Sequence, residues 1–182
     1  MKRNGLTFWM KTMQAQAGYD NSSVISDFVN YVNEKIAMLG ITNPDCVCNF
    51  DKTNVYFSPE FTHTIAEKGA KTVAIVAPAG TNQCTVMLGC SFSGKKLPPY
   101  VVWKGTDTGQ IAAECCKPVE NGLAPGITYA VQCKAWMDEV RVLDWIERVW
   151  KPHTMQLTGH YLLVWDSFMA HVTAAVKMKL AL

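Results

Sequence analysis

The spacing of the hydrophobic residues changes after Pro44, and this change constrains the fold more than any other feature. Before Pro44, apolar residues recur at three- and four-residue steps, the period of one helical face. The spacing predicts an amphipathic helix over 23–39, with Ser22 and Ser23 as N-cap types and Gly40 as a C-cap. After Pro44, short runs of strand-forming residues follow, so the chain combines helices with a sheet.

Four runs after Pro44 predict strands, because they are rich in the β-branched and aromatic residues that suit a pleated sheet. These runs are 46–51 (continued by 55–57), 72–76, 84–92 and 98–103. Residues 93–96 are a turn signal between the last two. Pro98 and Pro99 cannot donate to a sheet ladder, so we expect them at the start of their strand or on a sheet edge.

The second half of the chain returns to helical spacing after a loop. Residues 104–128 are rich in glycine and proline and predict a loop. From Ala135 a helix is expected, limited by Pro152, then a strand over 160–165 and a helix over 172–182. The expected apolar face of the helix that starts at Ala135 contains Trp136, Val140, Leu143, Ile146, Val149 and Trp150. The element order predicts an α/β fold, a mixed sheet with flanking helices in the order of a ribonuclease-H-like core.

The overall composition indicates one globular domain and excludes several classes. The chain has 182 residues, 49% hydrophobic and 18% charged, which is unlike a disordered chain. Its net charge of +2 excludes an electrostatic DNA-binding arm, so contact with nucleic acid would need a local basic patch or a metal site. No uninterrupted apolar run reaches eighteen residues, and no signal peptide is expected, so no membrane partner is predicted.

The seven cysteines are an odd number and are scattered along the chain. No pair of C-x-x-C or Cys/His motifs with zinc spacing is present, so free thiols in a reducing compartment are expected rather than a zinc site.

Asp51 and Asp166 each follow an apolar run that predicts a strand. Functional groups of α/β proteins often lie at strand ends, where neighbouring carboxylates can share a divalent cation that removes their mutual repulsion. An equally simple interpretation is that each aspartate caps a turn. On pattern alone both interpretations stay open.

Other polar residues have ordinary explanations beside functional ones. His171 lies five residues after Asp166, where a site role and a structural role are both open. Lys95, Lys96 and Lys104 could contact phosphates, and solubility explains them equally well. Solvation explains five other acids in the second half of the chain, which are Asp107, Glu114, Asp138, Asp144 and Glu147.

Two segments resemble the motifs around the first two catalytic acids of DDE transposases, in the pogo/Tigger-like group of the mariner superfamily. Residues 49–57 (NFDKTNVYF) resemble N-M-D-E-T-x-V-Y-F, and residues 163–171 (LVWDSFMAH) resemble L-x-W-D-S-F-R-A-H. Residues 89–99 resemble the hairpin A-x-G-x-K-L-P-P that lies between them. Trp136-Met137-Asp138 and Trp145 resemble the helix before the second acid.

This resemblance implies a ribonuclease-H-like fold and metal-dependent DNA cleavage and strand transfer. Asp51 and Asp166 would be two ligands of a three-acid site for Mg²⁺ or Mn²⁺, of the two-metal type, with water and then a DNA 3′-hydroxyl as nucleophile. The resemblance also implies DNA as the partner and the nucleus as the location of the protein. A homodimer is compatible with the resemblance. It divides the chain into the end of a centromere-protein-B-type helix-turn-helix with linker (1–19), a linker helix (20–44) and a partial endonuclease domain (45–182).

Two departures from the family pattern modify this expectation. Lys52 stands where the family commonly has Glu, and we expect its side chain to point to solvent. No acid follows Asp166, so the third ligand is missing and the fold is expected to be incomplete at the C-terminus. The chain alone is therefore expected to be inactive or very weak in DNA cleavage. The alternatives are a domesticated, non-catalytic DNA-binding or protein-interaction module and a fragment without a stable fold.

Overall fold

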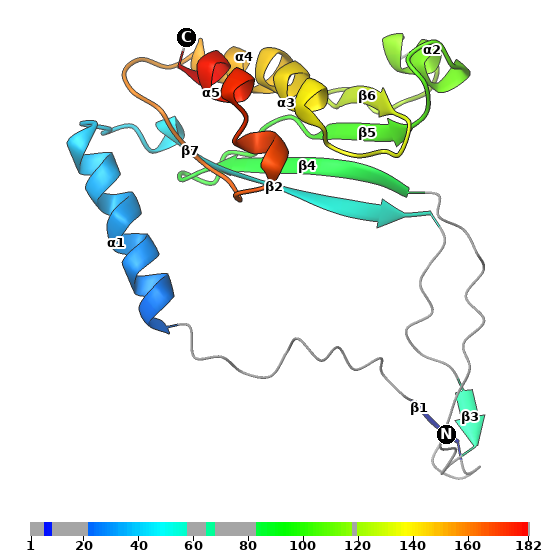
Figure 1. The fold of residues 1–182 in the computed structure, drawn as a ribbon, viewed down its shortest axis with the longest axis horizontal. Helices are drawn as coiled ribbons and strands as arrows, with labels where there is room; N and C mark the ends of the chain where they lie inside the picture. Colours follow the sequence, from blue (N-terminus) through cyan, green and yellow to red (C-terminus); the bar gives the residue numbers. More distant parts are fainter. Residues whose placement is uncertain (1–5, 9–21, 58–64, 68–82, 118–119, 182) are drawn as a thin grey trace.

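The computed structural model describes residues 6–8, 22–57, 65–67, 83–117 and 120–181, and its centre is a five-stranded sheet (Figure 1). The strands lie in the order β6-β5-β4-β2-β7. Their bounds are β2 Val47–Tyr56, β4 Gln83–Ser91, β5 Tyr100–Lys104, β6 Thr128–Gln132 and β7 Leu162–Val164. A separate two-stranded sheet pairs β1 (Leu6–Phe8) with β3 (Ile65–Glu67).

The sheet is mixed, because the central strand pairs are antiparallel and the pair at each edge is parallel. β2, β4 and β5 form an antiparallel meander, β7 lies parallel to β2, and β6 lies parallel to β5. Helices cover the face that is uppermost in Figure 1. They are α3 (Glu139–Trp145), a π-helical turn (Ile146–Trp150), α4 (Lys151–Thr154) and α5 (Ala174–Leu180). The expected ribonuclease-H-like mixed sheet with flanking helices is confirmed.

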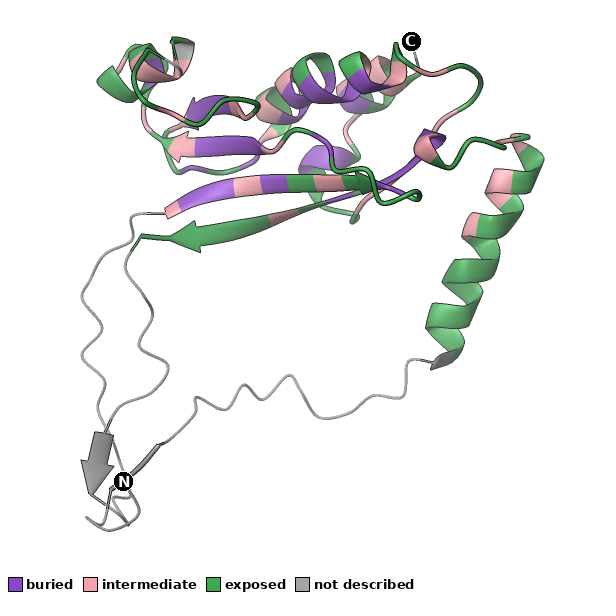
Figure 2. Ribbon diagram, turned by 180° about the vertical axis from the view of Figure 1, so that it is seen from behind, coloured by how far each residue is buried: buried purple, intermediate pink, exposed green. Residues whose placement is uncertain are grey.

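Aromatic residues fill the space between the helices and the sheet. The Phe50 ring on β2 meets the edge of Trp145 at a centroid distance of 4.6 Å and Trp150 at 6.0 Å. Phe50 and Trp145 are fully buried, and the buried surfaces of sheet and helices face each other in Figure 2. Such packing contributes hydrophobic stabilisation and favours edge-to-face geometry. This core holds β2 and β7 in register.

The expected effect of Pro152 was wrong, because the helix continues past it to Thr154. Proline lacks an N–H and its ring would collide with the carbonyl of Arg148 in a regular α-helix. The helix widens to a π-turn just before the proline, where the Lys151 N–H donates to the Ile146 carbonyl. The widened turn accommodates Pro152 without ending the helix.

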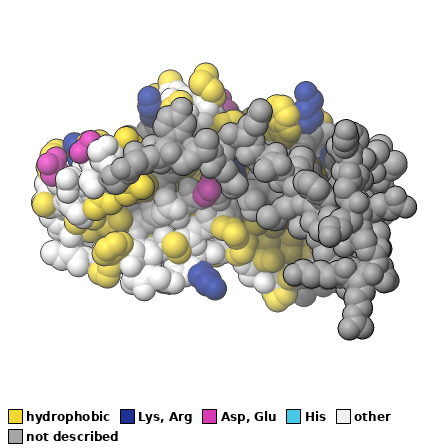
Figure 3. All heavy atoms as spheres, turned by 90° about the horizontal axis from the view of Figure 1, so that it is seen from below, with side chains coloured by type: hydrophobic (Ala, Val, Ile, Leu, Met, Phe, Trp, Pro, Cys, Tyr) yellow, Lys and Arg dark blue, Asp and Glu magenta, His cyan; other side chains and the backbone are white. Residues whose placement is uncertain are grey.

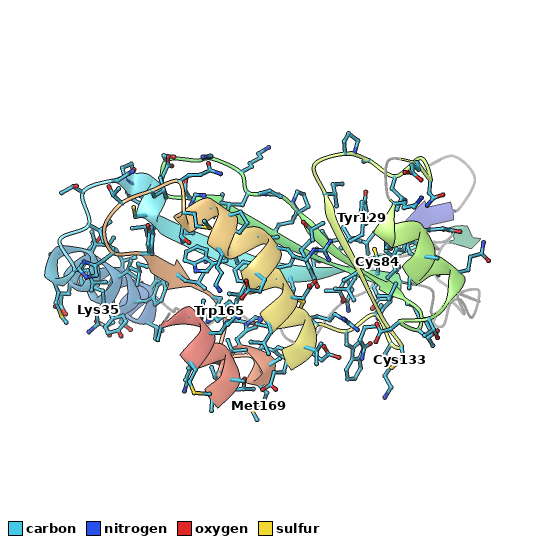
Figure 4. All side chains as sticks on the ribbon, turned by 90° about the horizontal axis from the view of Figure 1, so that it is seen from above. Lys35, Cys84, Tyr129, Cys133, Trp165 and Met169 are labelled. Carbon is cyan, nitrogen blue, oxygen red and sulfur yellow. The ribbon has the colours of Figure 1, made fainter. Side chains whose placement is uncertain are left out.

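Two expectations for this half of the chain need correction. Trp136 and Val140 are exposed rather than on the core face: Trp136 precedes α3, which begins only at Glu139 after the Asp138 cap, and Val140 lies on the solvent side of its first turn. The 104–128 region contains helix α2 (Gln110–Cys116), which packs over a second apolar cluster. That cluster includes Cys84, Val101 and Tyr129, and Figure 4 shows Cys84 and Tyr129 close together.

Helix α1 spans Ser22–Met38, which confirms the helix expected over 23–39. It projects from one end of the sheet (Figure 1), and most of its surface is exposed (Figure 2). On its expected apolar face, Ile25 and Phe28 are 61% and 53% exposed, whereas Ile36 is half-buried. Only the C-terminal part of this face therefore packs on the sheet.

The remaining strand and thiol expectations have clear outcomes. β2, β4, β5 and β7 match the predicted strands, and Pro98 and Pro99 precede β5 as expected. The strand expected over 72–76 lies outside the described residues. Cysteines 46, 48, 84, 90 and 133 are free thiols. Among the described residues, no helix is long and apolar enough to cross a membrane.

Candidate active site

The parallel pairing of β2 with β7 sets the positions of the two candidate aspartates. Val47 pairs with Leu162 and Asn49 with Val164. Two residues further along each chain, the same register puts Asp51 and Asp166 at one level of neighbouring strands. Asp166 lies just beyond β7 as expected, but Asp51 is mid-strand rather than at a strand end, because pairing with β4 extends β2 to Tyr56.

Asp51 is exposed and lies on the face of β2 opposite to the buried Phe50, since strand neighbours point to opposite faces. Its Oδ1 accepts a hydrogen bond from the Lys52 N–H at 2.7 Å. Among the described side chains, none forms an ion pair with it. Seen from below, the coloured part of the molecule shows more hydrophobic than charged side chains (Figure 3). Asp51 therefore has carboxylate oxygens accessible to an external ligand.

Asp166 already has a cationic partner and a histidine, one on each carboxylate oxygen. Lys52 Nζ lies 3.2 Å from Oδ2, and His171 Nδ1 lies 2.6 Å from Oδ1. The Phe168 N–H also donates to Oδ1, at 3.3 Å. Partial burial raises the pKa of Asp166, but the hydrogen bonds from Lys52 and Phe168 and the charges of Lys52 and His171 outweigh it, so the pKa lies below its ordinary value. Asp166 is therefore ionised at neutral pH.

Lys52 does not point freely to solvent, contrary to expectation. Its side chain is 21% exposed, and its ammonium lies 3.6 Å from the centroid of the Phe168 ring, in a cation–π contact. Because Lys52 and Asp51 are strand neighbours, Lys52 reaches Asp166 from the face of β2 opposite to Asp51. Strand alternation does point Lys52 away from Asp51, as expected. On that face, however, the ammonium contacts Asp166 and Phe168 instead of solvent alone.

His171 is a buried residue that positions Asp166. Its ring stacks on Trp165 at 4.5 Å with an interplanar angle of 13°, and its side chain is 1% exposed. Figure 4 shows Trp165 beside α3 and α5. Nε2 is buried with no hydrogen-bond partner among the described residues. A buried ring of this kind holds a carboxylate in place and is not exposed to a substrate. Phe168 and Trp165 were missed as site residues, although both stand in the W-D-S-F segment.

The other sequence candidates are engaged in structural contacts. Asp107 pairs with Arg141 at 2.8 Å, and Asp138 caps α3. Glu114 accepts a hydrogen bond from Gln110, one turn away on α2. Asp144 accepts from Tyr100 and Arg148, while Glu147 pairs with Lys151 and Lys179. Lys95, Lys96 and Lys104 form no ion pair with any described side chain, so the phosphate and solubility interpretations both stay open.

A family model for the DDE superfamily endonuclease matches residues 81–182. The chain belongs to the DDE superfamily endonucleases. This DDE endonuclease chain is also similar to the human protein "Pogo transposable element with KRAB domain", at 29% identity over 132 residues. The mouse protein of the same name is 28% identical over 132 residues. Each match covers 71% of this chain and 20% of the relative.

The DDE endonuclease chain therefore spans about a fifth of the length of these curated relatives. No solved structure matches it. The match to the family and to relatives named after the pogo element confirms the resemblance to a pogo-like DDE transposase.

Enzymes of the DDE superfamily use divalent metal ions, so the acid pair needs to be compared with what such an ion requires. Mg²⁺ takes one or two carboxylates together with water and phosphate oxygens. Asp51 offers free oxygens, whereas both oxygens of Asp166 are already in contact with Lys52 and His171. Among the described residues, no three His, Cys, Asp or Glu side chains are placed to hold a metal. In the described arrangement the DDE residues do not fit a two-metal site.

Proposed function

We propose that this chain is a transposase-derived, metal-dependent DNA endonuclease and strand-transfer domain, and that by itself it cleaves DNA weakly or not at all. Asp51 and Asp166 would be two of the acids that hold Mg²⁺ or Mn²⁺. The observation that supports this role is the parallel β2–β7 register, whose last pair, Asn49 with Val164, lies two residues before each aspartate. The observation that supports low activity is the contact of both Asp166 oxygens with Lys52 and His171.

A nicking assay tests this proposal. The chain is incubated with supercoiled and linear DNA in Mn²⁺ and in Mg²⁺, beside Asp51→Asn and Asp166→Asn. Asp107→Asn is the matched control, because Asp107 is an exposed acid paired with Arg141 and has no contact with Asp166. We expect at most trace nicking, lost in the first two variants and kept in the control.

Two results would contradict parts of this proposal. Robust nicking that Asp51→Asn abolishes would show that the chain is active alone. Robust nicking that neither Asp51→Asn nor Asp166→Asn reduces would show that these acids do not form the active site.

A second candidate function is a domesticated, non-catalytic module that binds DNA or another protein. The ion pair between Lys52 and Asp166 favours it, because it neutralises one of the two acids without a metal. Binding to DNA that persists in EDTA and falls steeply with salt would support this function. Cleavage that requires Mn²⁺ would support the first candidate.

The domain division, a homodimer and a nuclear location are further parts of the proposal. α1 lies outside the sheet core, which supports a linker helix over 20–44 between the remnant of a helix-turn-helix with linker (1–19) and the partial endonuclease domain (45–182). Relatives named after the pogo element support a DNA-acting protein in the nucleus. Sedimentation at several concentrations tests the dimer, and imaging of the tagged chain tests the location.

A further inference from the structure

We propose that Lys52 is a built-in counter-ion that competes with a divalent cation for Asp166, so that metal binds this carboxylate only when Lys52 is displaced. This inference rests on the proposed role of Asp51 and Asp166 as a metal-binding pair. The Lys52 side chain would then control whether a divalent cation can bind Asp166.

The contacts of Lys52 hold its ammonium at Asp166. Nζ is 3.2 Å from Oδ2 and 3.6 Å from the centroid of the Phe168 ring, and the side chain is 21% exposed. The Asp166 side chain is 50% exposed, so salt screens this pair in part, and the contact with the Phe168 ring adds to the hold on the ammonium. Phe168 lies two residues after Asp166, so the same loop supplies both the carboxylate and the aromatic ring. Lys52 is thus held by two groups of one loop, which makes its position specific.

A divalent cation and the Lys52 ammonium weaken each other's binding to Asp166. Both need the Oδ2 lone pairs, and two cations a few ångströms apart repel each other. The other oxygen offers no free alternative, because Oδ1 lies 2.6 Å from His171 Nδ1 and accepts a hydrogen bond from the Phe168 N–H. His171 is buried and stacked on Trp165, whereas Lys52 is partly exposed on a rotatable stem. Lys52 is therefore the contact that a metal can displace.

The face on which Lys52 lies adds a second effect. Strand alternation puts Lys52 and Asp51 on opposite faces of β2, so the ammonium binds Asp166 from the side away from Asp51. An Asp166 carboxylate held by Lys52 is drawn toward that side and is less available to an ion that also contacts Asp51. Removing the ammonium should both free Oδ2 and allow the two aspartates to act on one ion.

Binding of Mn²⁺ alone, measured by electron paramagnetic resonance of the free ion, tests the inference. Lys52→Met keeps an unbranched apolar side chain of similar length and removes the charge. Lys151→Met is the matched control, because Lys151 is also a lysine in an ion pair, 2.8 Å from Glu147. We expect Lys52→Met to bind Mn²⁺ about fivefold more tightly or better, the equivalent of one ion pair, and the control to bind like the wild type.

Two further variants make the result specific. Lys52→Arg keeps the positive charge and should keep the weak binding. Asp166→Asn in the Lys52→Met background should remove the gain. Circular dichroism checks that each variant is folded, and Lys52→Gln replaces Lys52→Met if the latter is not.

The outcomes separate this inference from the proposed function. Equal Mn²⁺ affinity of wild type and Lys52→Met, with binding still lost in Asp51→Asn and Asp166→Asn, would overturn the role of Lys52 and leave the metal-binding pair intact. Absence of Mn²⁺ binding in every variant would overturn both. A gain in Lys52→Met that survives Asp166→Asn would also overturn the inference, because the ion would then bind elsewhere.

Discussion

The ring of Phe50 lies directly over Gly89, its partner across the β2–β4 ladder. A β-carbon at position 89 would be 2.0 Å from Cε1 of that ring, a separation that real atoms do not adopt. The absence of a side chain at Gly89 therefore allows Phe50 to reach Trp145 and Trp150 in the helical layer.

The first prediction concerns Gly89→Ala. The added methyl must move a fully buried ring, and such overpacking costs about 1–3 kcal/mol. Urea denaturation should show a lower free energy of unfolding. Gly105→Ala is the control, since its β-carbon would meet Ile111 and Val131 at an ordinary 3.6 Å. Equal stability of both variants would show that the Phe50 ring can move freely.

The second prediction compares two tryptophans. Trp145 is fully buried among Phe50, Trp150 and Trp165, so Trp145→Ala should lower the free energy of unfolding by about 3–5 kcal/mol. Trp136 is 57% exposed, and Trp136→Ala should stay within about 0.5 kcal/mol of the wild type. Thermal and urea unfolding of both variants check this. A large loss in Trp136→Ala would place that ring in the core.

The third prediction concerns pH. Hydrogen bonds from Ser93 and Ser91 to Asp45 lower the pKa of that carboxyl below its ordinary 3.8. Because the folded pKa is the lower one, the stabilisation is present above about pH 3.8 and is lost as pH falls through the folded value. The melting temperature of Asp45→Ala should therefore lie below that of the wild type at pH 6, with a gap that narrows toward pH 3.

Ser93→Ala provides the control for that pH effect. Removing the strongest donor to Asp45 should shrink the pH-dependent gap between wild type and Asp45→Ala. A gap of the same size at pH 6 and pH 3, with or without Ser93, would show that Asp45 contributes no charge-dependent stability.

The fourth prediction concerns thiol reactivity. Burial raises the pKa of Cys48 to about 12, and the residue is 1% exposed, so little reactive thiolate forms at pH 8. Alkylation with iodoacetamide, followed by peptide mass spectrometry, should modify the exposed Cys90 and Cys133 well before Cys48. Equal rates in the native protein would contradict the buried position of Cys48. Alkylation in urea, where all three thiols should react alike, controls for intrinsic reactivity.

Local periodicity was enough to predict helix α1, most strands and the class of fold, because each of these has a repeating apolar pattern. It predicted that 55–57 continue the first strand, but it did not show that 52–54 join the two parts into one unbroken strand, because most residues after Asp51 are exposed and depend on pairing with β4. Helix α2 was missed because glycines and prolines surround its seven residues. Its stability depends on packing over the second cluster, which is a tertiary effect.

The candidate site shows the same division between local and tertiary information. Asp51 and Asp166 could be named from the motifs that flank them, because each follows an apolar strand pattern. The parallel pairing of the two strands then brings these segments side by side. The partner of Lys52 could not be predicted, because 114 positions separate Lys52 from Asp166. Strand alternation gives only the face on which Lys52 lies. His171 had two open roles that only its burial and its stacking on Trp165 could separate.

The π-turn before Pro152 also makes the helix sensitive to changes in chain length. In an α-helix, residues five positions apart differ in direction by roughly 140°, so Trp145 and Trp150 would diverge. The widened turn brings them into stacking distance, 6.2 Å between centroids, with Phe50 beside both. Deleting one residue within 146–150 would restore regular α-helical winding and leave the Pro152 ring to collide with the carbonyl one turn before it. This segment should therefore tolerate many substitutions but no single-residue deletion.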